Sequence, residues 1–245
     1  MMLKKSLSIL CLSACCLLAS CSQSTNTNGP WETLFNGHDL DGWKMVGDKG
    51  VVVVSDSAIV CTQVAQTTKH AFVCTNEKYS DYILEMDIKT DSKCNSGILL
   101  RASEQAPEEC EAGYVSLYGY QVKLDSQLQR KWTGGIFYDF GNSWRWLYSL
   151  EHDERARNAN RVGEWNHFRI EAIGSSIKVW VNHIPVTHLI NSDYKEGYIA
   201  IKIHSLPPHF KDQEIRYGRY KNIQIITQHP EKHVMAMDLP ALEVQ

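Results

Sequence analysis

The sequence lacks an excess of charge of one sign. It has 25 lysine and arginine residues against 28 aspartate and glutamate residues, which gives a formal net charge of −3 at pH 7. A nucleic-acid-binding domain needs a basic surface, so no nucleic-acid partner is expected. The sequence also lacks CxxC pairs and cysteine–histidine clusters with zinc-finger spacing. A polar or neutral partner fits this composition better.

No apolar run in the sequence is long enough to span a membrane. Lys4 and Lys5 precede an apolar run over residues 7–19, which is too short for a spanning helix but typical of a signal peptide. The run ends in LASC, the pattern of a bacterial lipobox, which predicts a signal peptide over residues 1–20 and acylation of Cys21. We therefore expect a protein of the bacterial cell envelope, lipid-anchored on a periplasmic or outer-membrane surface. An ordinary secretory signal cleaved nearby is the alternative.

The mature chain divides into a tether, one domain and a tail. Residues 21–29 combine the lipidated cysteine with a run of Ser, Gln, Thr, Asn and Gly, which cannot bury enough apolar surface to fold. Residues 30–228 are enough for a single domain with a sizeable core, and no repeat or second linker divides them. Residues 229–245 form a C-terminal tail whose structure the sequence does not predict.

Four cysteines follow the lipobox: Cys61, Cys74, Cys94 and Cys110. Export would permit disulfides, and four cysteines allow three pairings between which the sequence does not choose. We interpret these cysteines as structural or simply buried rather than catalytic.

Short runs of alternating apolar and polar residues predict an all-β sandwich. These runs lie at residues 82–88, 97–101, 120–125, 168–172, 177–181, 198–204 and 220–226. Asn182 and His183 stand between two apolar runs, where a tight turn would fit. The longer stretch over residues 143–161 is either an insertion loop over a site or a short helix.

Alternation also sorts the side chains onto two faces, because residues two apart share a face. Seven apolar residues are expected to point into the core: Ile98, Leu100, Val122, Leu124, Ile199, Ile201 and Ile203. The opposite face then carries Asn95, Leu99, Arg101, Gln121, Lys123, Asp125, Ala200, Lys202 and His204. A solvated strand face is the simpler interpretation of any one polar residue, but an amide, an acid, a histidine and several cations recur on this face.

Several sequence blocks resemble one family. FNGHDLDGW at 35–43, NSGILLR at 95–101, GYQVKLD at 119–125 and WTGGIFY at 132–138 are similar to blocks of the 3-keto-α-glucoside-1,2-lyase/3-keto-2-hydroxy-glucal hydratase family. The closing blocks of that family resemble residues 163–174, 197–204 and 221–225. Together these blocks cover nearly all of the mature domain.

The resemblance implies a concanavalin-like, laminin-G-like jelly-roll β-sandwich and chemistry on a sugar already oxidised at C3. A ketone at C3 acidifies the proton on C2, so a modest base can remove it and the group on C1 can leave. The expected substrate is a 3-keto sugar or glycoside, and a sugar 3-oxidoreductase is the expected pathway partner. No pair of catalytic carboxylates of the glycosidase type is needed.

This chemistry needs a base near C2, donors for the enediolate oxygen and groups that hold the sugar. His204 or Asp125 is the predicted base, with Arg101 and Lys123 as donors. The predicted substrate-binding residues are Asn95, Gln121, Trp132, Tyr138 and Lys202.

Two lysines depart from the family pattern. Lys123 stands where a glutamate is common and Lys202 where a glutamine is common. An added cation disfavours a divalent metal, although a metal bound by His204, Asp125 and Gln121 stays an alternative. The lysines could instead stabilise the enediolate, or could mark a member with altered activity.

Three other interpretations compete with the keto-sugar lyase. Glu85 and Asp87 share a strand face as in sandwich endoglucanases, but Thr90 stands where a third acid is expected, so this face is interpreted as solvated. A non-catalytic, lectin-like module that binds glycans at the cell surface is the main alternative. A structural envelope lipoprotein is a third.

Overall fold

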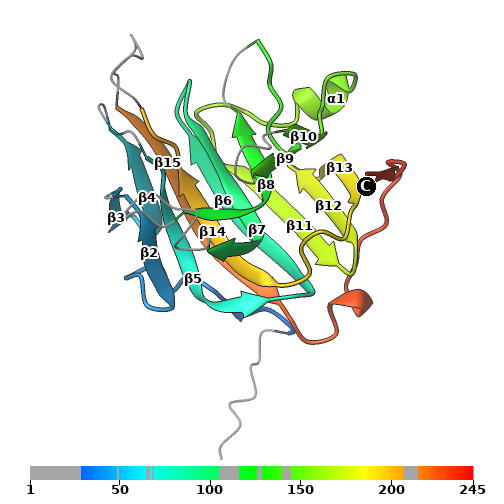
Figure 1. Cartoon of the computed structure of the whole chain (residues 1–245), viewed down its shortest axis with the longest axis horizontal. Coiled ribbons are helices and arrows are strands. Elements are labelled where there is room, and N and C mark those ends of the chain that lie inside the picture. The colour runs from blue at the N-terminus through cyan, green and yellow to red at the C-terminus, as the bar shows by residue number, and fades with distance from the viewer. Residues whose placement is uncertain are drawn as a thin grey trace, which may run out of the picture.

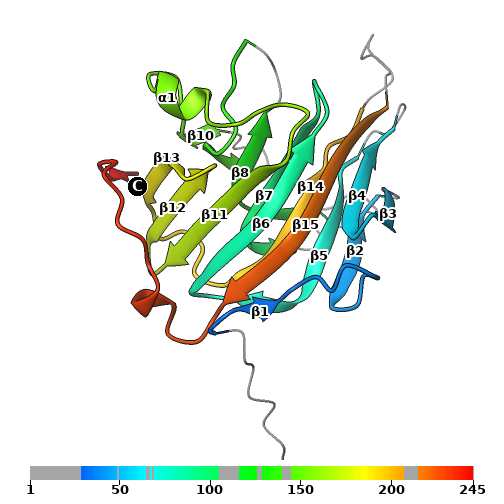
Figure 2. The same cartoon turned by 180° about the vertical axis from the view of Figure 1, so that it is seen from behind.

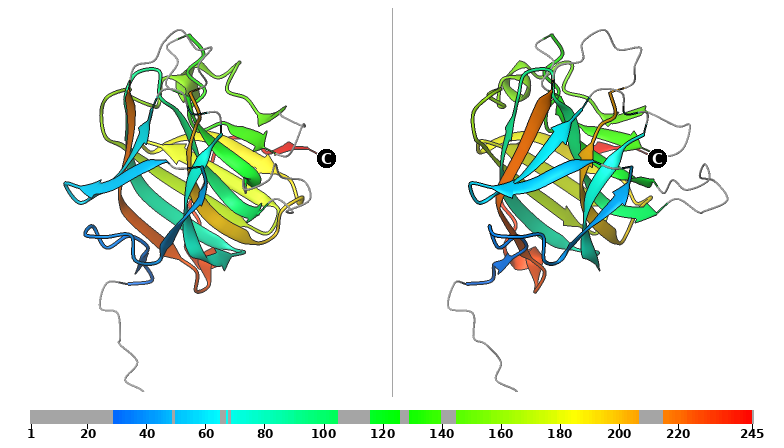
Figure 3. Two further views of the ribbon diagram at one scale, coloured as in Figure 1. Left: turned by 60° about the vertical axis from the view of Figure 1, so that its left-hand side comes forward. Right: turned by 90° about the vertical axis from the view of Figure 1, so that its left-hand side faces the viewer.

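A computed structural model describes residues 29–48, 50–64, 67, 69–104, 116–125, 129–139, 145–206 and 215–244. Across these residues the strands form two packed sheets, and the chain is a jelly-roll β-sandwich as the sequence predicts. The seven-stranded sheet faces the viewer in Figure 1 and the nine-stranded sheet faces the viewer in Figure 2. Figure 3 shows the two layers from the side. The predicted lipidation site Cys21, and also Cys110 and Trp144, lie outside the described residues.

The seven-stranded sheet has the order β10-β9-β8-β7-β14-β5-β2, and every neighbouring pair is antiparallel. Its strands are β2 (Trp43–Gly47), β5 (Ala71–Tyr79), β7 (Asn95–Glu104), β8 (Leu117–Asp125), β9 (Ile136–Asp139), β10 (Arg145–Tyr148) and β14 (Gly197–Ile203).

The nine-stranded sheet has the order β16-β13-β12-β11-β6-β15-β4-β3, with β1 paired to β15. Its strands are β1 (Glu32–Thr33), β3 (Val51–Ser55), β4 (Ala58–Gln63), β6 (Tyr82–Thr90), β11 (Asn166–Ile173), β12 (Ser176–Val181), β13 (Ile184–Ile190), β15 (Arg216–Ile226) and β16 (Leu242–Glu243). Each of the seven alternating runs in the sequence lies on one of the strands of these two sheets, except that His204 directly follows the end of β14.

The core lies between the inner faces of the sheets. All seven residues predicted to point inward belong to one buried cluster, in which they meet residues of the nine-stranded sheet such as Phe168 and Ile170. Burial of a large aliphatic side chain stabilises the fold by about 1.5–3 kcal/mol. This packing sets the direction of the alternation, so the polar residues of β8 and β14 must lie on the outer face.

The alternation fails at Arg101. The register between β7 and β8 shifts beside this residue, and Arg101 has a φ of +50°. An extra residue in a strand re-aims the side chains near it. The Arg101 guanidinium is only 1% exposed and donates to Ser80 O (2.7 Å), Gly174 O (2.7 Å) and Asp81 (3.1 Å). The prediction that Arg101 shares the outer face with Asn95 is therefore wrong. The Arg101 guanidinium instead has a structural role, because it holds together turns that connect strands.

The stretch over residues 143–161 contains a short helix in its described part. This helix is α1 (Glu154–Arg157), and the Asp153 carboxylate caps it by accepting from Ala156 N at 2.9 Å. Asn182 and His183 both have positive φ and form the tight turn between β12 and β13, as predicted. The tail after β15 contains a 3-10 turn, η2 (Pro230–Lys232), before β16.

The three described cysteines are free and buried: Cys61, Cys74 and Cys94. Burial raises the pKa of the Cys74 and Cys94 thiols to about 12, so both are protonated at neutral pH. Among the described residues, no helix has the length and apolar character needed to cross a membrane.

Candidate active site on the outer face of the seven-stranded sheet

The outer face of the seven-stranded sheet has an apolar end and a polar end. Six buried residues form a second hydrophobic cluster at the apolar end: Phe72, Cys74, Leu99, Ala102, Leu117 and Ala200. A pocket of about 210 Å³ lies at the polar end, lined by His70, Asn95, Gln121, Lys123, Arg130, Phe137, Trp146, Lys202 and His204. Five of these residues are predicted site residues, namely Asn95, Gln121, Lys123, Lys202 and His204. The structure thus brings together residues that are far apart in the sequence.

Gly97 lies between the two lysines of the pocket. It pairs with Lys123 on β8 and with Lys202 on β14, so the two lysines flank a position without a side chain. The Gln121 side chain occupies that space, because a Cβ on Gly97 would lie 2.2 Å from Gln121 Nε2. Gln121 Nε2 donates to Ser96 O at 3.1 Å, which holds the amide in place. The two lysines are 7% and 4% exposed, so this is not a solvated strand face.

Two buried acceptors in the pocket have no hydrogen-bond partner among the described residues. They are Gln121 Oε1 and Asn95 Oδ1. Buried polar atoms are almost always hydrogen-bonded, so these two acceptors are available to a donor group that enters the pocket. Sugar hydroxyls are donors of this kind.

Gln63 of β4 aligns two residues of the pocket. Its Nε2 donates to Asn95 O at 2.8 Å and to His204 O at 2.9 Å, while its Oε1 accepts from Asn95 N at 3.1 Å. Gln63 is 3% exposed and belongs to the other sheet. The amide therefore fixes the ends of β7 and β14 relative to each other, which is the support that a precise site needs.

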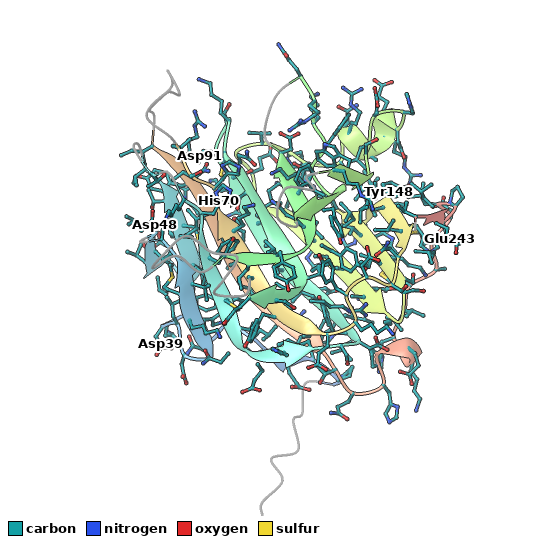
Figure 4. All side chains as sticks on the ribbon, viewed as in Figure 1. Asp39, Asp48, His70, Asp91, Tyr148 and Glu243 are labelled. Atoms are coloured by element: carbon teal, nitrogen blue, oxygen red, sulfur yellow. The ribbon has the colours of Figure 1, made fainter. Side chains whose placement is uncertain are left out.

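His204 has the protonation pattern that a base needs. Its Nδ1 lies 2.9 Å from Ser205 O, and a carbonyl oxygen can only accept, so Nδ1 carries a proton. The lone pair of the neutral ring is then on Nε2. The ring contacts His70, with 4.3 Å between the ring centroids. Figure 4 labels His70 on the same side of the molecule as Asp48, whose N–H donates to His70 O at 3.0 Å.

Asp125, the other predicted base, does not line the pocket. Its carboxylate is 3% exposed and accepts from Arg130 Nε at 2.5 Å. The Arg130 guanidinium also lies over the rings of Trp132 and Trp146, at 5.4 Å from each centroid. Arg130 thus stands between Asp125 and the aromatic wall, and the carboxylate acts by holding Arg130.

The predicted aromatic platforms do not line the pocket and pack against the core instead. Trp132 packs edge-on against Trp146 at 4.8 Å, and Tyr138 stacks on Tyr194 at 5.7 Å. Trp146 and Phe137 line the pocket instead, because Phe137 pairs with Gln121 and Trp146 pairs with Phe137. Tyr138 is one residue further along β9 and therefore points to the other face.

Sequence reasoning missed four residues of the pocket: His70, Arg130, Phe137 and Trp146. Period two could have found Phe137, since its neighbour Ile136 belongs to the buried core and Phe137 must then face outward. His70 and Arg130 lie outside the strands, where alternation gives no signal.

The described donors do not fit a divalent metal. Within the described residues, no group of three histidine, cysteine, aspartate or glutamate side chains is placed to hold a metal ion. Of the three ligands considered from the sequence, Asp125 is bound by Arg130, and Lys123 and Lys202 line the same pocket. Ammonium groups compete with a cation for the same oxygen donors.

The fold and the pocket define a jelly-roll β-sandwich with a polar site on the outer face of one sheet. The sequence model of the family described as the 3-keto-alpha-glucoside-1,2-lyase-like domain matches residues 30–226. The chain belongs to this family, and its function is carbohydrate-related.

Solved structures share the fold at low sequence identity. A protein of Parabacteroides distasonis ATCC 8503, provisionally described as a glycosyl hydrolase, has a TM-score of 0.55 at 19% identity, over 81% of this chain and 94% of that one. The carbohydrate-binding module CBM66 of Bacillus subtilis has a TM-score of 0.55 at 14% identity, over 76% and 95%. A Bacillus subtilis protein of unknown function with a galectin-like fold has a TM-score of 0.52 at 12% identity, over 80% and 94%. No curated protein matches the sequence.

Proposed function

We propose that this chain is a carbohydrate-active lyase and hydratase that acts on 3-keto-glycosides. The observation that supports this best is the pocket itself, in which the imidazole of His204 and two ammonium groups meet two acceptors that have no hydrogen-bond partner within the described part of the chain. Membership of the 3-keto-alpha-glucoside-1,2-lyase-like family suggests which sugar chemistry these groups serve.

The first step is removal of the proton on C2. His204 accepts this proton at Nε2, because Ser205 O holds the other ring nitrogen protonated. The C2–H electrons form an enediolate whose negative charge lies on the C3 oxygen. Lys123 and Lys202 line the pocket on either side of Gly97 and stabilise this charge.

The second step is elimination at C1. The enediolate electrons re-form the C3 carbonyl and a C1=C2 double bond, and the bond from C1 to the aglycone oxygen breaks. The departing oxygen takes up a proton. Water then adds at C1 while C2 regains a proton, which gives net hydrolysis without a pair of catalytic carboxylates.

Substrate binding uses the remaining residues of the pocket. Gln121 Oε1 and Asn95 Oδ1 accept hydrogen bonds from hydroxyls of the sugar. Trp146 and Phe137 offer an apolar wall for the face of the sugar ring. In this role they replace Trp132 and Tyr138.

The cell envelope is the proposed location. The lipobox supports an acyl anchor on Cys21, with residues 22–29 as a tether. The substrate carries a ketone at C3, so a reaction that oxidises a sugar hydroxyl at C3 must supply it. A sugar 3-oxidoreductase has that chemistry.

The test is turnover of 3-keto-glucosides by the purified protein, with the unoxidised glucosides as matched controls. We expect enediolate absorbance and release of the aglycone from the keto sugars alone, unchanged by a chelator. No turnover of any keto sugar by the folded protein would refute the lyase. Saturable binding of unmodified glycans would then favour a glycan-binding module, and the absence of both would favour a structural lipoprotein.

A further inference from the structure

The backbone of one residue, Ser205, contacts both histidines of the pocket. Ser205 N–H donates to His70 Nδ1 at 3.0 Å, and Ser205 O accepts from His204 Nδ1 at 2.9 Å. The two rings lie against each other, with 4.3 Å between centroids and 53° between ring planes. They come from different parts of the chain, because His70 directly precedes β5 and His204 directly follows β14.

These two bonds fix opposite tautomers. A backbone N–H can only donate, so His70 Nδ1 must carry a lone pair, and the proton of the neutral ring is on Nε2. A carbonyl can only accept, so His204 Nδ1 is protonated and the basic lone pair is on Nε2. His70 Nε2 is therefore a hydrogen-bond donor, and His204 Nε2 is an acceptor.

His70 is held in its neutral form. Burial lowers its pKa far below the ordinary value, and the positive charges of Lys202 and Lys123 lower it further, as does His204 whenever that ring is protonated. A neutral imidazole is a hydrogen-bond donor that neither competes for the substrate proton nor needs to lose its own.

We propose that His70 is a second catalytic residue, whose Nε2–H donates a hydrogen bond to the C3 oxygen of the substrate as His204 Nε2 takes the proton from C2. This role rests on the proposed lyase function. The C2–H bond breaks, its proton moves to His204, its electron pair enters the enediolate, and His70 keeps its proton throughout. His204 thus acts as the proton acceptor and His70 as the hydrogen-bond donor, as their opposite tautomers require.

Two substitutions at His70 separate the catalytic role from a structural one. His70→Gln places an amide N–H near the position of Nε2 but loses the acceptor for Ser205 N–H. His70→Asn keeps an acceptor near the position of Nδ1 but has no donor at Nε2. Loss of one oxyanion donor lowers kcat about 100- to 1,000-fold. We expect this loss in His70→Asn at nearly unchanged KM, and a kcat for His70→Gln at least about tenfold higher than that of His70→Asn.

The opposite order would overturn the proposal. If His70 served only to hold Ser205, His70→Asn would keep its activity and His70→Gln would lose it. Thermal unfolding of both variants identifies any loss that comes from misfolding. An inactive wild-type protein would refute the lyase function itself, and the proposed role of His70 with it.

The tautomers can be measured without turnover. In full-length protein labelled with ¹⁵N, we expect a pyridine-type shift for His70 Nδ1 and a pyrrole-type shift for its Nε2, with the reverse pattern in His204. The His70→Asn and His204→Asn variants assign the signals. The same tautomer in both rings would overturn the assignment of donor and acceptor even in an active protein.

Discussion

The outer faces of the two sheets carry similar polar side chains, but among the described residues only the pocket on the seven-stranded sheet is lined by buried acceptors without a hydrogen-bond partner. On the nine-stranded sheet, the Asp87 carboxylate binds His167 Nδ1 at 3.2 Å and Asn222 Nδ2 at 2.6 Å. Arg169 pairs with Glu85 at 2.6 Å and Glu171 at 2.9 Å. These contacts join the acids of this face to cations and amide donors, although Glu171 Oε2 has no hydrogen-bond partner among the described residues.

The seven-stranded sheet differs because Gln121 Oε1 and Asn95 Oδ1 lack partners within the described part of the chain. Size does not explain the difference. A pocket of about 570 Å³ beside Asp87 and His167 is larger than the pocket of about 210 Å³ beside His204. The comparison teaches that buried acceptors without partners in the lining of a pocket, more than the volume or polarity of the pocket, distinguish a candidate site from a surface hollow.

The largest expected effect is the loss of the base. His204→Asn keeps a donor for Ser205 O but has no lone pair at the position of Nε2, so kcat/KM for a 3-keto-glucoside should fall about 100- to 10,000-fold. His167→Asn is the matched control, because His167 lies on the other sheet beside Asp87. Steady-state kinetics of the two variants is the measurement. Equal losses in both would remove the distinction between the two faces.

The next effect concerns the contribution of Arg169, on the outer face of the nine-stranded sheet, to the stability of the fold. Arg169→Met leaves Glu85 and the buried Glu171 without their cation, which should lower the free energy of unfolding by about 3–5 kcal/mol. Activity per folded molecule should stay the same, because Arg169 is not part of the pocket. Denaturant unfolding together with kinetics measures both quantities. A loss of activity at full stability would show that this face also serves the reaction.

Much of this architecture could be predicted from the sequence, because burial of one face enforces alternation. The faces of Val122 and Ile201 follow from period two alone, and Lys123 and Lys202 are placed correctly as a consequence. Arg101 could not be placed, since nothing local to the sequence marks the bulge that turns its side chain toward Ser80 and Gly174.

Contacts between distant segments account for the other differences. Asp125 and Arg130 are five residues apart, but nothing in the sequence predicts that the loop between them folds back and places Arg130 on the Asp125 carboxylate. His70 reaches the pocket only because β5 pairs with β14, which brings it next to Ser205. Alternation orders the residues of one strand, whereas a site depends on which strands and loops become neighbours.

A smaller effect should separate substrate binding in the pocket from the stability of the fold. Gln121→Met removes a buried oxygen that has no partner among the described residues, at the loss of one bond to Ser96 O. We expect unfolding free energy to change by less than about 1 kcal/mol, while KM rises about tenfold because a hydroxyl loses its acceptor. Gln224→Met on the other sheet is the control, since Gln224 donates to Glu85 at 3.2 Å and should leave KM unchanged. An unchanged KM in Gln121→Met would mean that the substrate does not use this oxygen.

The smallest effect is a dependence of stability on pH that originates at His70. Burial, together with Lys202, His204 and Lys123, lowers the pKa of His70 in the folded protein from its ordinary value of 6.5. Below pH 6.5 the unfolded chain therefore binds a proton at this residue that the folded chain does not bind, so stability falls as the pH falls. Above pH 6.5 His70 is neutral in both states and has no effect on stability. Between pH 6.5 and 5.5 this contribution lowers the unfolding free energy by about 1 kcal/mol. Urea unfolding at several pH values should show that His70→Asn has a shallower acid slope than wild type. An equal slope in both would mean that His70 accepts a proton in the folded state. The His70 ring would then be less desolvated than its burial implies.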